Sequence, residues 1–354
     1  MSKTVIKNID TLITISSDSK LKTGKEMSNL NHIKNAWIEI KDDKISDFGN
    51  MENWKGIDNW NNVNIIDAEN GTVLPCWCDS HTHIVYAGNR EQEFVDKING
   101  LSYEEIAKKG GGILNSSLIL KNTSEEDLYT QSMKRINEVI IKGTGAIEIK
   151  SGYGLDTEQE LKMLRVIKKI KETSPITVKS SFLGAHAIPA KYKANPDKYV
   201  DIVIHEMIPE IAKEKLADYI DVFCEKGFFS VEQTEKILKA GLNHGLKPKI
   251  HANELDFSGG IQVGVKMGAI SVDHLEFTSK NEIECLKNSN TIPTLLPSTA
   301  FFLGLKYPPA RKMIDAGLPI ALATDYNPGS SPSGNMEFIL SLGCIKLKMT
   351  PEEV

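Results

Sequence analysis

Two histidines, His81 and His83, stand two residues apart after an apolar segment. Residues i and i+2 of an extended chain point to the same side, so both imidazoles can reach one ion. With His251 and Asp325, which follow two later apolar segments, they form a donor set suited to Zn(II) or Fe(II), with an open position for water. Such an ion lowers the pKa of water from 15.7 to about 7. The pattern predicts one divalent metal ion that supplies hydroxide at neutral pH.

Two more residues are candidates for handling protons beside this ion. Glu254 follows His251 by three residues, close enough to pass a proton to a leaving nitrogen, and His274 can orient the hydroxide or polarise the attacked group. Asp325 can bind the metal and accept the proton of water. Taken alone, Glu254 is typical of a solvated loop carboxylate and His274 of a core histidine. The neighbouring metal ligands favour the catalytic interpretation.

Eight apolar segments alternate with segments of helical character from residue 73 onward. They are 73–78, 145–150, 176–183, 219–224, 247–250, 269–273, 291–296 and 319–324. Eight strand–helix repeats over about 250 residues are the number and length expected for a (β/α)8 TIM-type barrel. Apolar runs are typical of parallel strands that are covered on both faces. The fold class is therefore predicted to be α/β.

Polar residues follow almost every predicted strand, and all histidines except His32, His205 and His244 fall at these positions. In a barrel these strand ends meet on one face, where active sites lie. Helix starts are predicted at Ser124, at Asp156, and at Ser102 with Glu105. The candidate residues are therefore expected to converge although they lie far apart in the sequence.

Residues 1–72 are predicted to form a small β-rich domain, and residues 73–354 the barrel. Segment 4–15 is rich in β-branched residues, and 36–40 and 44–48 flank a polar turn that is typical of a hairpin. The first domain is too small to hold a good core alone and is expected to pack on another part of the protein.

Composition excludes several classes of protein. A net charge of −5 over 354 residues argues against nucleic acid, and no apolar run approaches a membrane span. Five scattered cysteines and an N-terminus without the apolar core of a signal peptide favour the cytoplasm. Neither a phosphate loop, a dinucleotide fingerprint nor a nucleophile elbow is present. Lys150 follows the second predicted strand rather than the fourth, where some two-metal barrels carry a modified lysine, so one metal is favoured.

Taken together, these motifs resemble the amidohydrolase superfamily and, within it, the imidazolonepropionase family. The resemblance covers essentially the whole chain. Besides the metal and proton-handling residues, the segments that carry it are 87–91, 110–114, 148–155, 184–189, 251–254 and 323–331.

The resemblance implies hydrolysis of the cyclic amide 4-imidazolone-5-propanoate to N-formimidoyl-L-glutamate in histidine breakdown, with the metal-activated water attacking the ring carbonyl. Arg90 matches the family's substrate-binding arginine, and a guanidinium can grip the propanoate with two hydrogen bonds. The other matched substrate contacts are Tyr153, His186, Glu254, Asn327, Gly329 and Ser330. A small-molecule substrate and a homodimer are likewise implied. Without the family match, Arg90 is typical of a surface ion pair with Glu91 or Glu93.

Two departures from the family keep alternatives open. Cys76 follows Pro75 where the family commonly has glycine, and the chain ends at Val354, before the last barrel helix and the C-terminal strands that complete the β-domain in the family. The alternatives are another amidohydrolase, such as a cytosine- or guanine-type deaminase with no evident need for Arg90, and a truncated non-catalytic metal-binding protein.

Overall fold

The computed structural model describes residues 3–15, 20–57, 59–101, 105 and 111–354. The chain divides into two compact units. One comprises residues 1–22, 26–76 and 353, and the other residues 23–25, 77–352 and 354. The prediction that residues 1–72 and 73–354 are separate domains stays a prediction.

The first unit is a five-stranded sheet. Its strands are β1 (Lys3–Thr14), β2 (Asn31–Lys41), β3 (Lys44–Asn50), β4 (Val63–Asp67) and β5 (Thr72–Val73). The strand order is β3-β2-β1-β4, and β5 also pairs with β1. Short 3-10 helices span η1 (Gly24–Ser28), part of which belongs to the second unit, and η2 (Met51–Asn53).

The predicted hairpin is confirmed as β2 and β3, which pair antiparallel. Asp42 and Asp43 make its turn with φ of 45° and 65°, the left-handed conformation that two-residue hairpin turns favour. Ile9, Leu12, Ala36 and Ile38 are buried and form the core of the unit.

The second unit contains the predicted parallel barrel. Its strands are β6 (Trp77–Thr82), β7 (Thr144–Lys150), β8 (Thr177–Ala185), β9 (Tyr219–Cys224), β10 (Lys247–Ala252), β11 (Ser271–His274), β12 (Ile292–Leu295) and β13 (Ala321–Leu322). Neighbours in this order pair in parallel. The α/β barrel prediction is confirmed.

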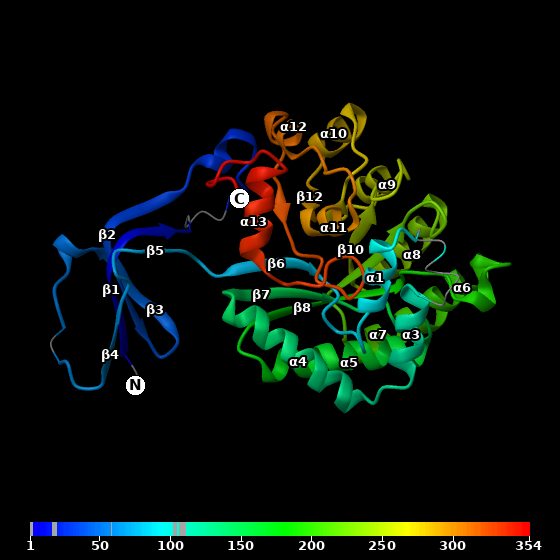
Figure 1. The fold of residues 1–354 in the computed structure, drawn as a ribbon, viewed down its shortest axis with the longest axis horizontal. Helices are drawn as coiled ribbons and strands as arrows, with labels where there is room; N and C mark the ends of the chain where they lie inside the picture. The colour runs from blue at the N-terminus through cyan, green and yellow to red at the C-terminus, as the bar shows by residue number, and fades with distance from the viewer. Residues whose placement is uncertain (1–2, 16–19, 58, 102–104, 106–110) are drawn as a thin grey trace. The chain divides into compact units, whose positions relative to one another are not determined.

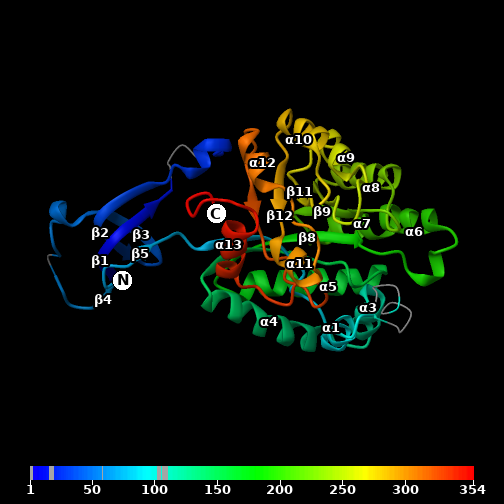
Figure 2. The same ribbon diagram turned by 45° about the horizontal axis from the view of Figure 1, so that its top comes forward.

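Helices surround these strands, as Figures 1 and 2 show. The α-helices are α1 (Glu91–Ile98), α3 (Ile113–Lys121), α4 (Glu125–Ile141), α5 (Thr157–Thr173), α6 (Pro196–Ile202), α7 (Ile208–Glu214), α8 (Val231–Asn243), α9 (Gly260–Lys266), α10 (Lys280–Lys287), α11 (Pro297–Leu303), α12 (Ala310–Asp315) and α13 (Met336–Ile345). A 3-10 turn (Ala190–Tyr192) precedes α6, and a π-helical turn (Val203–Met207) joins α6 to α7. None of the described helices combines the length and apolarity needed to cross a membrane.

The barrel closes after its last strand rather than through it. The nitrogen of Asp325 donates to the oxygen of His81 at 3.0 Å, and the nitrogen of His83 donates to the oxygen of Tyr326 at 2.9 Å. A parallel bridge between Thr82 and Tyr326 lies between these bonds. The segment after β13 therefore continues the sheet to β6.

The prediction for the first barrel strand was wrong by several residues. The strand was expected over 73–78, but β6 covers Trp77–Thr82, and Thr72–Val73 pairs with β1 in the first unit. Pro75 has no N–H to donate to a ladder, which separates the two strands. His81 consequently lies on its strand and not after it, as do His251 on β10 and His274 on β11.

Two predicted helix starts are confirmed. The side chain of Ser124 accepts a hydrogen bond from the nitrogen of Asp127, and that of Asp156 from the nitrogen of Gln159. Such caps satisfy donors that the first helical turn leaves unpaired. The start predicted at Ser102 lies outside the described residues.

Two glycines let α9 lie directly against the strands that carry site residues. A Cβ added at Gly260 would come within 2.7 Å of the Cβ of Ala252 on β10, and one at Gly264 within 2.6 Å of a methyl group of Val272 on β11. Neither has a positive φ, so the demand is for space alone. The two glycines therefore set how closely α9 packs against β10 and β11, the strands that carry His251 and His274.

Replacing Gly264 by alanine should reduce the free energy of unfolding by about 1–3 kcal/mol, because overpacking a filled interior displaces its neighbours. Chemical denaturation of both proteins measures the difference. Lys266→Ala is the control: Lys266 lies on the same helix as Gly264 and forms an exposed ion pair with Glu235 of α8, so its loss should change stability by less than about 1 kcal/mol. Equal losses in the two variants would contradict the packing role of Gly264.

Candidate active site

Four predicted metal ligands come together at the carboxyl ends of the barrel strands. His81 lies on β6, His83 follows it, His251 lies on β10 and Asp325 follows β13. Oδ1 of Asp325 is 3.5 Å from Nε2 of His81 and 3.4 Å from Nε2 of His83, and Nε2 of His83 is 3.3 Å from Nε2 of His251. All four side chains are buried.

This spacing fits ligand atoms of one ion. Metal bonds of about 2.0–2.1 Å place two tetrahedral ligand atoms about 3.4 Å apart, as these atoms are. Nε2 of His81 is buried and has no hydrogen-bond partner among the described residues, although a buried polar atom normally has one. The residues therefore fit a divalent metal with nitrogen and oxygen ligands.

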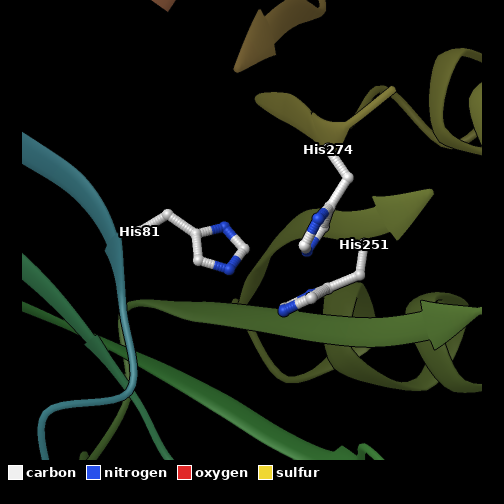
Figure 3. A group of neighbouring side chains, drawn as sticks. All are labelled: His81, His251 and His274. Carbon is white, nitrogen blue, oxygen red and sulfur yellow. The ribbon is translucent and has the colours of Figure 1, made fainter. Parts of the chain in front are cut away.

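The ring of His274 also faces this centre. Figure 3 shows His81, His251 and His274 turned toward a common space, and one ligand atom from each lies within 4.8 Å of the others. Nδ1 of His274 is 3.8 Å from Oε2 of Glu254. His274 and Glu254 thus lie beside the candidate metal ligands and beside each other.

Two aspartates hold the metal-binding imidazoles from behind. Nδ1 of His81 is 2.6 Å from Oδ2 of Asp273, and Nδ1 of His251 is 3.0 Å from Oδ1 of Asp221. A carboxylate accepts hydrogen bonds, so each Nδ1 carries the proton and each Nε2 presents its lone pair to the centre. Sequence reasoning missed both residues, although a single charged residue within an apolar strand is a signal that could have found them.

Burial sets the protonation of the centre. It lowers the pKa of His81 and of His83 well below the usual value, helped by Lys150 for His81 and by His186 for His83. Both rings are therefore neutral near pH 7, which is the form that binds metal. Burial also raises the pKa of Glu254 to about 8, with a further increase from Asp325, so Glu254 can hold a proton at neutral pH.

Two site residues have backbone conformations that side chains rarely adopt. The φ of His274 is 86° and that of Asp325 is 54°. Oδ2 of Asp325 accepts a 2.6 Å hydrogen bond from Oγ1 of Thr299, which leaves Oδ1 facing the imidazoles. Left-handed backbone at non-glycine residues is concentrated at functional sites, where surrounding contacts hold it in place.

A cavity of about 660 Å³ lies over this centre and contains the predicted substrate contacts. Among the residues that line it are Arg90, Tyr153, His186, Glu254, Asn327, Gly329 and Ser330. The ring of His186 stacks on His83 at 5.2 Å, and its Nδ1 is 3.0 Å from the oxygen of Gly152. All the candidate residues except His81 therefore line one cavity, and His81 lies next to Asp325 in the same cluster.

Arg90 takes part in an ion pair that the sequence suggested, but not at the surface. Its Nε and Nη2 donate to Oε2 of Glu93 at 2.9 and 2.6 Å, and its side chain is only 9% exposed. Gly329 packs against the guanidinium so closely that an added Cβ would overlap it. Glu93 and Gly329 thus hold a cation in the cavity wall.

The loop after Asp325 is held by its own polar groups. Oδ1 of Asn327 accepts hydrogen bonds from the nitrogens of Gly329 and Ser330, both at 2.8 Å. Its Nδ2 donates to Oγ of Ser330 at 2.8 Å. Asn327 therefore fixes the loop that places Gly329 beside Arg90.

The apolar part of the cavity was not predicted from the sequence. Phe94 and Lys97 line it from α1, and Phe223, Phe301 and Phe302 line it from other elements. Phe94 and Lys97 are three residues apart, so they share one face of the helix. That spacing is common in helices and did not distinguish them as site residues.

No family model matches the chain. The fold, however, resembles several solved enzymes: the structure superimposes on 5-methylcytosine deaminase from Klebsiella pneumoniae with a TM-score of 0.70, covering 98% of this chain and 82% of that one at 16% identity. Guanine deaminase from C. acetobutylicum gives a TM-score of 0.61 over 96% and 78% of the two chains at 18% identity. Together with the His/Asp cluster at the strand ends, this likeness defines the class by its fold, an α/β barrel with a candidate metal centre.

Curated relatives define the family within this class. The chain is 61% identical to the imidazolonepropionase of Flavobacterium johnsoniae over 99% of its own length and 85% of the relative. It is 45% identical to that of Alkaliphilus oremlandii, over 99% and 83%. The protein belongs to the imidazolonepropionase family, as the sequence resemblance predicts.

Purified protein should hold close to one divalent ion per chain, and His81→Ala or His251→Ala should lose most of it, because each removes a ligand from the centre. Elemental analysis after dialysis measures the occupancy. His244→Ala, at an exposed histidine after α8, is the control and should keep its metal. Two tightly bound ions per chain, or full occupancy after His251→Ala, would contradict the site.

Proposed function

We propose that the protein hydrolyses the cyclic amide 4-imidazolone-5-propanoate to N-formimidoyl-L-glutamate in histidine degradation. This proposal rests on one observation: a single cavity contains both a cluster of candidate metal ligands and the guanidinium of Arg90. The substrate has the matching pair, a ring carbonyl to be attacked and a propanoate to be bound. Membership of the imidazolonepropionase family supports the same assignment.

The proposed cofactor is one Zn(II) or iron ion held by His81, His83, His251 and Asp325. Such an ion supplies a hydroxide nucleophile near pH 7 by lowering the pKa of water. Asp273 and Asp221 keep the rings of His81 and His251 in the tautomer that faces the ion. A homodimer and a cytoplasmic location stay predictions from the sequence.

Arg90 binds the propanoate in this proposal, because a charge-assisted pair with a carboxylate is strong and directional. Glu93 holds the guanidinium in place, and the loop of Asn327, Gly329 and Ser330 borders it. Tyr153 and His186 line the cavity between Arg90 and the metal ligands and hold the ring. The substrate is thereby positioned with its carbonyl over the metal centre.

Glu254 and His274 handle protons in the proposed reaction. Asp325 or Glu254 takes the proton of the attacking water, and Glu254 returns a proton to the ring nitrogen as the C–N bond breaks. His274 polarises the carbonyl oxygen: its burial lowers its pKa well below the usual value, so it acts as a neutral ring. The raised pKa of Glu254 suits a group that must both accept and donate a proton near neutral pH.

Supplying 4-imidazolone-5-propanoate to metal-reconstituted protein tests the proposal directly. The ultraviolet absorption of the imidazolone should disappear while N-formimidoyl-L-glutamate accumulates in equal amount. Cytosine and guanine serve as competing substrates. Their deamination without turnover of the imidazolone would overturn the proposal in favour of a deaminase.

Glu254→Gln should lower turnover by about 10²–10⁴-fold, because it keeps the shape of the side chain and removes its proton transfer. Metal content should remain at the native level. Asp256→Asn, two residues away and half-exposed, is the control and should retain activity. If Glu254→Gln loses its metal together with its activity, Glu254 is a ligand and the proton role is wrong.

Arg90→Met should raise KM for the imidazolone by roughly 10–150-fold, because one charge-assisted hydrogen bond is worth about 1.5–3 kcal/mol. Steady-state kinetics should show a smaller effect on kcat if the contact is equal in the ground and transition states.

A substrate analogue with a neutral amide in place of the propanoate separates charge recognition from general damage. The analogue should bind native protein poorly and lose little more on Arg90→Met, because both changes remove the same contact. Glu93→Gln, which keeps Arg90 but weakens its anchor, should show a smaller increase in KM than Arg90→Met. Equal losses for acid and amide would show that Arg90 does not bind the carboxylate.

A further inference from the structure

A group of buried charges lies inside the barrel behind the metal ligands. It consists of Glu148 and Lys150 on β7, Asp221 on β9, Lys249 on β10 and Asp273 on β11, each at most 5% exposed. Three carboxylates and two ammonium groups are thus enclosed in the protein, although burying a charge is costly unless it is paired. The reaction proposed above gives no role to either lysine.

Lys150 is in contact with the anchors of two metal ligands. Its Nζ is 2.8 Å from Oδ2 of Asp221 and 3.8 Å from Oδ2 of Asp273. The other oxygen of Asp221 holds His251, and Oδ2 of Asp273 holds His81. One ammonium group therefore stands behind imidazoles from two different strands.

Further contacts fix the ammonium group in this position. Nζ of Lys150 also donates to Oε1 of Glu148 at 2.6 Å. The same Oε1 accepts a hydrogen bond of 2.5 Å from Oγ of Ser181. The side chain of Lys150 is fully buried, so water does not compete for these contacts.

Lys249 lies in the same group of charges but contacts a different set of carboxylates. It pairs with Glu148, donates to the oxygen of Ser80 at 2.9 Å, and lies 3.6 Å from Oδ2 of Asp273. Its described ion pairs include Glu148 and Asp273 but not Asp221. The two lysines therefore share the charge group, and Lys150 alone of the pair joins the anchors of both His81 and His251.

We propose that Lys150 is a positioning residue for the metal centre, which sets metal affinity by holding Asp221 and Asp273 in the places from which they orient His251 and His81. Carboxylates that support metal-binding histidines typically change affinity by 10–100-fold when altered, and Lys150 acts on two of them at once. Without its ammonium, Asp221 loses the partner of the oxygen that does not hold His251, and Oδ2 of Asp273 loses one of the two ammonium groups beside it. The inference rests on the metal site of the proposed function but not on the identity of the substrate.

Metal titration of native and variant proteins tests this role without substrate. The Kd for Zn(II), measured by competition with a chelator, should rise by about 10–100-fold in Lys150→Met. Lys249→Met is the matched control, since it removes an equally buried ammonium from the same group, and its Kd should rise markedly less. Equal changes in the two variants, or an unchanged Kd in Lys150→Met, would overturn the proposal.

Two further variants guard against a simple loss of folding. Lys150→Gln keeps a donor for one carboxylate and should weaken binding in the same direction, whereas Lys150→Arg keeps the charge and should restore part of the affinity. Native-like affinity in Lys150→Gln would overturn the role, as would Lys150→Arg binding no better than Lys150→Met.

The visible spectrum of Co(II) bound in place of Zn(II) adds a readout of ligand geometry that a general loss of stability does not move. It should change in the Lys150 variants and stay native-like in Lys249→Met. A native protein that binds Zn(II) but does not hydrolyse the imidazolone would refute the proposed function and leave this test in force.

Discussion

The closure of the barrel by two backbone hydrogen bonds is the constraint on which the site depends. The bonds from Asp325 to His81 and from His83 to Tyr326 join the first barrel strand to the segment after the last. The same residues carry three of the four candidate metal ligands. Closing the sheet and assembling the ligand set are therefore one structural event, and the left-handed backbone of Asp325 is the local cost of making both at once.

Charged side chains lie in two layers, one on each side of the closure between β6 and the segment after β13. Below the ligands, Asp273 and Asp221 orient two imidazoles, and Lys150 and Lys249 balance the carboxylates. Above them, the cavity is lined by both polar and apolar side chains, with Arg90 fixed by Glu93. In these two layers Lys150, Lys249 and Arg90 each pair with a carboxylate, which gives a preorganised electrostatic environment around the reacting atoms.

The sequence predicted the parts of the site that have a local signature. His81 lies on β6 and His83 directly after it, two residues along the chain. His251, His274 and Asp325 end apolar segments, so a barrel brings these residues together. Asp221 and Asp273 are marked only as single charged residues within apolar strands, and the sequence does not show what they contact because their partners come from other strands. The start of β6 was misplaced because the apolar run continues through Pro75, and the sequence does not show that Thr72–Val73 pairs with β1. Arg90 was assigned as a substrate-binding residue from the family resemblance. The sequence offered Glu91 and Glu93 equally as its ion-pair partner, and the structure shows that it is Glu93.

The very short last strand has a consequence for the order of assembly. β13 pairs through only two residues, so little holds the end of the barrel until the bonds to β6 form. The set of candidate metal ligands is incomplete until this closure forms. The closure joins distant parts of the chain, so its entropic cost is high and we expect it to form late in folding. An ion that binds only the closed form stabilises it by mass action, by about 2.7 kcal/mol at a free concentration of 100 times Kd. A metal ion bound at this closure would therefore stabilise the closed barrel as well as supply a hydroxide nucleophile.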